Sequence, residues 1–135
     1  MVGKKNIVFG FFYFVTTLGL GMFLANQFTL PPEELGAWLQ SPQHMLLKTA
    51  HVHGNLESTL NIIIGYLLCR LALEAWIAKT VSILMIVGGV FHSGMLYLGG
   101  AGVDFAVNLT PVGGISIVVS MVLMGVGVAR LKSID

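Results

Sequence analysis

Ionisable and amide side chains are concentrated in one stretch of an otherwise apolar chain, residues 49–61. Its main polar members are His51, His53, Asn55, Glu57 and Asn61. Residues 62–69 are apolar and uncharged, so we expect one membrane helix with a polar half. An ionisable side chain at bilayer depth is costly unless it faces protein, water or a cofactor. The stretch therefore predicts a functional site within the membrane.

The helical repeat divides these polar residues between two directions. At about 100° per residue, one stripe holds His44, Lys48, His51 and Asn55, and a second holds His53, Glu57 and Asn61. Neither stripe is suited to face lipid. We therefore expect this helix to lie inside a bundle or between protomers.

Depth along the helices indicates which polar residues meet. Counted at about 1.5 Å per residue from the flanking basic residues, His92 is level with Glu57, and Tyr97 is level with His51 and His53. This predicts one polar pocket in the outer half of the bilayer. Any single histidine is explained equally well as a hydrogen-bonded bridge between helices. Such bridges do not require ionisable groups, however, so three histidines together with Glu57 favour a cofactor or catalytic site.

Several metal centres are compatible with these residue types. Imidazole is a ligand of zinc, copper and iron, including haem iron. His53 and Glu57, four residues apart, can chelate a metal ion, although zinc sites usually add a third protein ligand. One histidine on a haem iron leaves its sixth position open to substrate, whereas two close it for electron transfer. The residues alone leave these cases open.

The composition is that of an integral membrane protein. Only 10% of the 135 residues are charged and 56% are hydrophobic, with a mean hydropathy of +0.88, whereas soluble domains carry about 25% charged residues. The net charge of +1 gives no reason to expect a nucleic-acid partner. A single cysteine, Cys69, excludes an internal disulfide and a cysteine-based metal cluster within one chain.

The hydropathy pattern predicts an all-α fold, an integral membrane four-helix bundle in a single domain, residues 1–135. The four expected helices cover about residues 7–30, 46–69, 80–98 and 112–131. Pro31-Pro32-Glu33-Glu34 ends the first helix. Residues 33–39 predict a short amphipathic helix at the membrane interface.

The basic residues predict the orientation. Six of them fall on the side shared by both termini and the second loop: Lys4, Lys5, Arg70, Lys79, Arg130 and Lys132. By the positive-inside rule both termini are cytoplasmic, in a multi-pass protein of the inner (cytoplasmic) membrane. Lys48 is the exception, near the outer end of the second helix.

The second helix resembles that of styrene oxide isomerase and the related small membrane mutases that rearrange hydroxylaminobenzene. Those proteins show an Ala-His-x-Gly-x-x-x-Asn-Gly pattern; here the chain reads Ala50-His51-Val52-His53-Gly54-Asn55-Leu56-Glu57-Ser58. A weaker similarity lies in Gly94-Met95-Leu96-Tyr97-Leu98. Glu57 replaces the asparagine of the pattern, and His53 and His92 are additional to it.

The resemblance implies a haem b enzyme in which His51 ligates the iron at a contact between protomers of a homotrimer. Ferric iron would act as a Lewis acid on the substrate oxygen, with Glu57 and Tyr97 as the catalytic, orienting residues. Apart from the resemblance, the polar pocket itself leads us to expect His53, His92, Asn55 and Asn61 beside the cofactor, together with His51. We accordingly expect an isomerase or mutase acting on a small apolar epoxide or aryl hydroxylamine that enters from the lipid bilayer.

Two alternatives of other classes remain open. One is a non-catalytic haem or copper membrane protein, an electron carrier or a sensor, for which bis-histidine ligation through His53 or His92 would be the sign. The other is a packing subunit of a larger membrane complex, for which no cofactor would be found.

Overall fold

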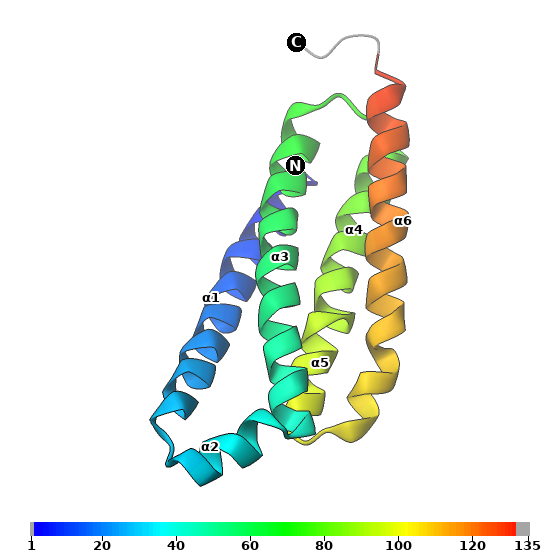
Figure 1. The fold of residues 1–135 in the computed structure, drawn as a ribbon. Helices are drawn as coiled ribbons and strands as arrows, with labels where there is room; N and C mark the ends of the chain where they lie inside the picture. The colour runs from blue at the N-terminus through cyan, green and yellow to red at the C-terminus, as the bar shows by residue number, and fades with distance from the viewer. Residues whose placement is uncertain (1, 132–135) are drawn as a thin grey trace.

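The computed structural model describes residues 2–131, which form helices joined by short turns (Figure 1). The elements in chain order are α1 (Lys4–Asn26), the 3₁₀ turn η1 (Gln27–Thr29), α2 (Pro32–Leu39), α3 (Pro42–Arg70), α4 (Ala75–Phe91), α5 (Ser93–Gly100), the 3₁₀ segment η2 (Asp104–Leu109) and α6 (Thr110–Ala129). No strand occurs within residues 2–131. The predicted all-α class is confirmed.

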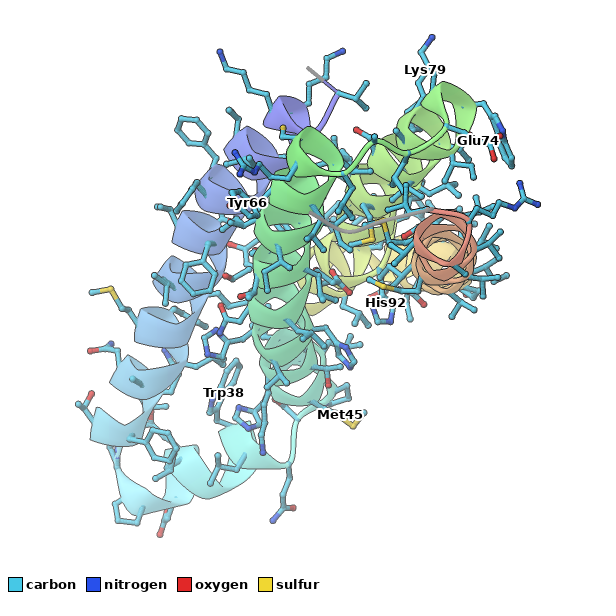
Figure 2. All side chains as sticks on the ribbon, turned by 90° about the horizontal axis from the view of Figure 1, so that it is seen from above. Trp38, Met45, Tyr66, Glu74, Lys79 and His92 are labelled. Atoms are coloured by element: carbon cyan, nitrogen blue, oxygen red, sulfur yellow. The ribbon has the colours of Figure 1, made fainter. Side chains whose placement is uncertain are left out.

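The long helices run alternately in opposite directions, side by side, and α2 lies across one end of them (Figure 1). Helix α1 packs mainly on α3, and α4 packs mainly on α6, while α3 also contacts α4 and α5. Seen along the bundle, α1 and α6 therefore lie on opposite sides (Figure 2). The start of α1, the end of α3, the start of α4 and the end of α6 share the upper end in Figure 1. Of the six basic residues assigned to one side of the membrane, all but Lys132, which lies outside residues 2–131, belong to that end.

Three segments are long and apolar enough to cross a membrane: Lys4–Thr29, Ala75–Gly100 and Asp104–Ala129. This supports a multi-pass membrane protein but corrects the expected four apolar spans. Helix α3 has the length, at 29 residues, but not the apolar composition, because polar side chains occupy its first half. It also begins at Pro42, earlier than predicted. Ser41 caps it by accepting a hydrogen bond from the His44 amide at 3.1 Å, which satisfies a free N–H of the first turn.

The predicted helix over residues 80–98 is not continuous. It is divided at His92, whose backbone angles, φ −95° and ψ −85°, are not helical. The segment contains no proline, the usual sequence sign of a kink. Gly113 of α6 lies directly against the break: a β-carbon at this position would overlap the backbone nitrogen of His92. The break thus coincides with the closest approach of α6.

Two apolar clusters lie at different levels of the bundle. One joins α3, α4 and α6 through Ile64, Leu68, Ile77, Ala78, Val81, Met85 and Met124. The other joins α1 and α3 through Leu20, Leu24, Leu47 and Ala50. Large apolar side chains on the outer faces of α1 and α6, such as Phe12 and Val118, are exposed, as expected of surfaces that meet lipid.

Candidate metal centre and the neighbouring pocket

The two polar stripes of α3 point in different directions, as the helical repeat predicts. His51 and Asn55 contact α1, whereas Glu57 contacts His92 and Ser93, and Asn61 contacts α4 and also Asn6 of α1. The third face of α3, with exposed Val52, Leu56 and Ile63, is apolar. The polar half of this helix is therefore covered by protein on two sides only.

His51 forms a bridge between α3 and α1. Its Nδ1 lies 2.8 Å from the Thr17 carbonyl oxygen, so the tautomer that satisfies this contact carries its hydrogen on Nδ1 and donates it. Its Nε2 then accepts from the Asn55 side-chain amide at 3.3 Å. Thr17 Oγ1 in turn lies 2.6 Å from Asn55 Oδ1 and donates to it. Gly21 lies beside the ring, since a β-carbon there would be 2.5 Å from His51 Cε1.

These surroundings do not fit a haem ligated by His51 within one protomer. An iron ligand must direct a free nitrogen lone pair at the metal, whereas His51 Nε2 faces Asn55 of its own helix. The ring is also covered by α1 at Gly21. Asn55, expected beside the cofactor, is likewise engaged with His51 and Thr17. Both residues act here as a bridge between helices.

The group with the geometry of a metal site consists of His53, Glu57 and His92, which we call the triad. One ligand atom from each lies within 4.8 Å of the other two. His92 Nδ1 is 2.6 Å from Glu57 Oε1, and the rings of His53 and His92 are 4.8 Å apart at 76°. The predicted meeting of His92 with Glu57 is confirmed. The Glu57 side chain is 3% exposed and that of His92 is 25% exposed, so the group spans from the interior toward the surface.

The break in the third span explains how this carboxylate is held. Ser93 Oγ donates to Glu57 Oε2, while the adjacent His92 contacts Oε1. On a continuous helix, adjacent side chains point about 100° apart and would not reach the same group. The non-helical backbone at His92 brings both to one carboxylate. His92 itself points to the side of the bundle between α3 and α6 (Figure 2).

Two imidazoles and one carboxylate form a ligand set found on zinc, with a fourth position left for water or substrate. Bonds of about 2.1 Å at tetrahedral angles place the ligand atoms about 3.4 Å apart. The ligand atoms of the triad lie within 4.8 Å of one another, so on binding an ion this spread would have to narrow while the 2.6 Å contact between His92 and Glu57 opens. Ser93 would then hold the second carboxylate oxygen, as residues behind metal ligands commonly do.

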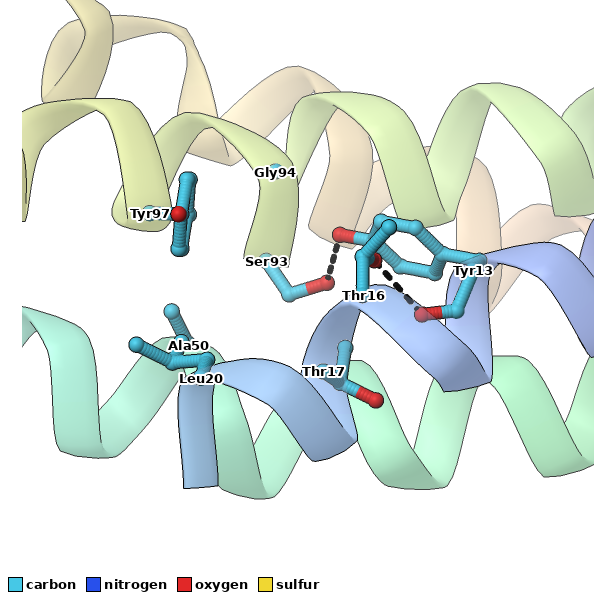
Figure 3. Close-up of a pocket in the computed structure, with 8 residues that line it drawn as sticks. All are labelled: Tyr13, Thr16, Thr17, Leu20, Ala50, Ser93, Gly94 and Tyr97. Carbon is cyan, nitrogen blue, oxygen red and sulfur yellow. Dashed lines mark hydrogen bonds between the residues drawn. The ribbon is translucent and has the colours of Figure 1, made fainter. Parts of the chain in front are cut away.

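A pocket of about 220 Å³ lies on the other side of Ser93, between α1 and α5 (Figure 3). It is lined by Tyr13, Thr16, Thr17, Leu20, Ala50, Ser93, Gly94 and Tyr97. Tyr13 Oη lies 2.6 Å from Ser93 Oγ and 3.0 Å from the Gly89 carbonyl oxygen, and its single hydrogen can be donated to either. Neither His53 nor His92 lines this pocket. The residues expected in a single polar pocket are therefore divided between the triad and this pocket.

The two residues expected to be catalytic are separated by this arrangement. Tyr97 lines the pocket and is 46% exposed. Glu57 belongs to the triad and approaches the pocket only through Ser93. A single small ligand in the pocket would therefore contact Tyr97 but not Glu57.

Asn61, expected beside the cofactor, instead belongs to a cluster of neutral side chains that we call the amide cluster: Asn6, Asn61 and Ser82. The Asn61 amide donates to the carbonyl oxygens of Glu57, at 3.0 Å, and Met85, at 3.1 Å, and it accepts from Asn6 at 3.0 Å. Its side chain has no hydrogen left for a ligand. Asn61 therefore joins α1, α3 and α4.

Sequence reasoning missed two residues of the site, Tyr13 and Ser93. Ser93 stands in a Gly89/Ser93 pair whose spacing indicates close helix packing, and that reading hides its bond to Glu57. Tyr13 stands among four phenylalanines, a context typical of a lipid-facing run. The adjacency of Ser93 to His92 is the one signal in the sequence that points to the site.

Comparison with models of protein families, with curated proteins and with solved structures finds no match to this chain.

Proposed function

We propose that this chain is a membrane protein that binds one divalent transition-metal ion, of the zinc class, through His53, Glu57 and His92. The proposal is carried by the convergence of three ligand atoms, from α3 and from the break between α4 and α5, within 4.8 Å. A carboxylate this deeply buried in an apolar bundle is costly unless it is paired or coordinates a metal.

A plain ion pair between Glu57 and His92 is the competing explanation. It satisfies both oxygens of Glu57, one through His92 and one through Ser93. It leaves His53 without a role, because this side chain has no hydrogen bond within residues 2–131 although its ring lies against that of His92. A metal ion gives the His53 nitrogen a partner.

The proposed topology has four membrane crossings, with α3 as the fourth. At about 1.5 Å per residue, its 29 residues extend about 43 Å, enough to cross a bilayer. Helices α1, α4 and α5 cover its polar stripes, which offsets its lower apolarity. With basic residues at the end shared by the start of α1 and the end of α6, both termini are proposed to be cytoplasmic.

The proposed activity is intramolecular isomerisation of a small apolar, oxygen-bearing molecule that enters from the bilayer. This part comes from the resemblance of residues 50–58 to the isomerase and mutase family. Isomerisation needs neither a co-substrate nor a redox partner. A metal ion in the triad would polarise an oxygen bound at its open position. Haem b held by His51 between protomers is the rival cofactor, and the same experiment distinguishes it.

The test is metal binding by the purified protein in detergent. After treatment with a chelator, Co²⁺ titration should give visible d–d absorption that saturates near one ion per chain and is displaced by Zn²⁺. His53→Ala should abolish this signal. His44→Ala is the matched control, because His44 lies on the same helix outside the triad.

Equal Co²⁺ binding by the His53→Ala and unsubstituted proteins would overturn the proposed metal site. A Soret band in the protein as purified, lost in His51→Ala, would establish the haem alternative instead.

A further inference from the structure

The pocket between α1 and α5 continues into a larger, more open groove. The groove measures about 610 Å³ and shares Thr16, Leu20 and Tyr97 with the pocket. It extends to Phe23 and Trp38 at the end of the bundle covered by α2. The pocket alone is smaller than the about 300–1,000 Å³ typical for drug-sized ligands. It therefore suits a molecule of one or two rings, and the groove provides an apolar path to it.

Four of the hydroxyl groups around the pocket already donate their hydrogen bonds to other groups of the protein. Thr16 Oγ1 donates to the Tyr13 carbonyl oxygen at 2.6 Å, and Thr17 Oγ1 donates to Asn55 at 2.6 Å or to the Phe14 carbonyl oxygen at 2.9 Å. Ser93 donates to Glu57. Tyr13 has one hydrogen and two acceptors within reach, the Gly89 carbonyl oxygen and Ser93 Oγ. Each of these four hydroxyls still has lone pairs for a ligand hydrogen.

The pocket therefore has more free hydrogen-bond acceptors than free donors, and this difference decides which ligands it recognises. Among its side-chain hydroxyls, only that of Tyr97 donates no hydrogen bond within residues 2–131. The inner end, at Tyr13 and Ser93, thus offers acceptors rather than donors. A ligand with an O–H fits such an end, whereas an ether of the same shape leaves it unpaired. An ammonium group would be costly here, since no carboxylate lines the pocket.

We propose that this pocket binds a small apolar alcohol or phenol, whose hydroxyl donates to Tyr13 Oη and whose hydrocarbon part lies against Leu20 and Ala50. Tyr97 lies at the junction with the groove and covers the ligand. The inference rests on the proposed function in one respect, the entry of a small apolar molecule from the bilayer. It does not require the metal ion.

The experiment measures equilibrium binding of 2-naphthol and of its methyl ether, 2-methoxynaphthalene, to the chelator-treated protein in lipid nanodiscs. Partitioning into protein-free nanodiscs is subtracted. We expect one saturable site for 2-naphthol and at least about tenfold weaker binding of the ether, about 1.4 kcal/mol. Tyr13→Phe should weaken naphthol binding by about tenfold and leave ether binding unchanged.

Tyr66→Phe is the control, because Tyr66 is exposed on α3 and lines neither the pocket nor the groove. Equal affinity for naphthol and ether in the unsubstituted protein would overturn the proposal, and this comparison needs no variant to fold. Unchanged naphthol affinity in Tyr13→Phe would also overturn it. Because the protein is metal-free, failure here is separate from failure of the triad to bind Co²⁺.

Discussion

The amide cluster and the triad are neighbours on the same face of α3, yet their chemistry differs. Asn61 and Glu57 are one turn apart, and each joins α3 to the third span. Asn6 and Asn61 are fully buried, and both hydrogens and the oxygen of each side-chain amide are bonded to protein groups. In the triad, Glu57 is buried but His53 and His92 are only half-buried, and His53 has no hydrogen bond within residues 2–131.

The difference shows how a structural polar group is told from a functional one inside an apolar bundle. A neutral cluster with every hydrogen placed stabilises one arrangement of helices and has no bonding capacity for a ligand. A group that combines ionisable side chains, partial exposure and an unused nitrogen retains such capacity. Polarity alone does not separate the two, since both clusters lie on the same stripe of α3.

Among substitutions that distinguish the triad from the amide cluster, Glu57→Gln is expected to have the largest effect, on Zn²⁺ affinity. The substitution keeps the shape of the side chain but removes the anionic metal ligand, so Zn²⁺ affinity should fall at least about a hundredfold, about 2.7 kcal/mol. Helix content by circular dichroism should not change. The measurement is a Zn²⁺ competition titration against a fluorescent chelator. Unaltered affinity would remove Glu57 from the metal site.

Asn61→Leu should show the reverse behaviour. It leaves a buried Asn6 hydrogen without its acceptor and removes the side-chain hydrogen bonds to the Glu57 and Met85 carbonyl oxygens, which keep only their bonds within the helices. The free energy of unfolding should therefore fall by about 1–3 kcal/mol. Zn²⁺ affinity of the folded protein should be unchanged. Reversible unfolding in mixed micelles measures the stability, and Gln27→Leu, at an exposed amide, is the control. A variant as stable as the parent would contradict the structural role of the cluster.

His51→Leu tests whether the α1 bridge belongs with the amide cluster. Hydrogen bonds between membrane helices contribute about 0.6 kcal/mol on average and about 1.7 kcal/mol at most. The loss of stability should therefore be smaller than for Asn61→Leu, and Co²⁺ binding should be retained. Loss of Co²⁺ binding without loss of stability would place His51 among the metal ligands.

The smallest effect concerns Glu74, an exposed carboxylate outside the membrane-spanning segments, which we compare with the buried carboxylate of Glu57. The hydrogen bond from Trp76 Nε1, at 2.8 Å, and then that from Arg130, at 3.1 Å, lower the pKa of Glu74 below its ordinary value. Its stabilising contribution is therefore present above the unfolded-state pKa and is lost as pH falls through the lower folded-state pKa. This contribution is small, because Glu74 lies at the surface, where solvent screens the interaction.

Trp76→Phe should raise the pKa of Glu74 toward its ordinary value, measured by carboxyl ¹³C NMR titration. Arg130→Gln should also raise it, because it removes the second hydrogen bond and the positive charge beside the carboxylate. An identical titration curve in Trp76→Phe would contradict the assignment.

Local signals were sufficient to predict several elements and one contact. The Pro-Pro-Glu-Glu sequence marks the end of the first helix and the start of α2, and counting along the helices brings His92 to Glu57. The break at His92 was not predicted, although Gly88-Gly89 and Ser93-Gly94 flank it; its exact position coincides with the approach of Gly113 from a distant helix. The position of His51 depends on a backbone carbonyl, that of Thr17, which any residue type supplies. Residue types were therefore sufficient to predict the two polar stripes, but not which polar residues form hydrogen bonds between helices and which remain available to a ligand.

The contact between Gly113 and the broken backbone at His92 also has an evolutionary consequence. A mutation that adds a β-carbon at residue 113 would place it against main-chain atoms of Phe91 and His92. Main-chain atoms cannot move to another rotamer, so substitutions at residue 113 are not tolerated while the break persists. At Gly21 the obstacle is the His51 ring, which can turn aside, so that pair is expected to diverge first. In descendants of this chain, glycine at 113 should be inherited together with the His92-Ser93 dipeptide. This linkage is a pairwise signature by which distant relatives can be recognised after the rest of the sequence has changed.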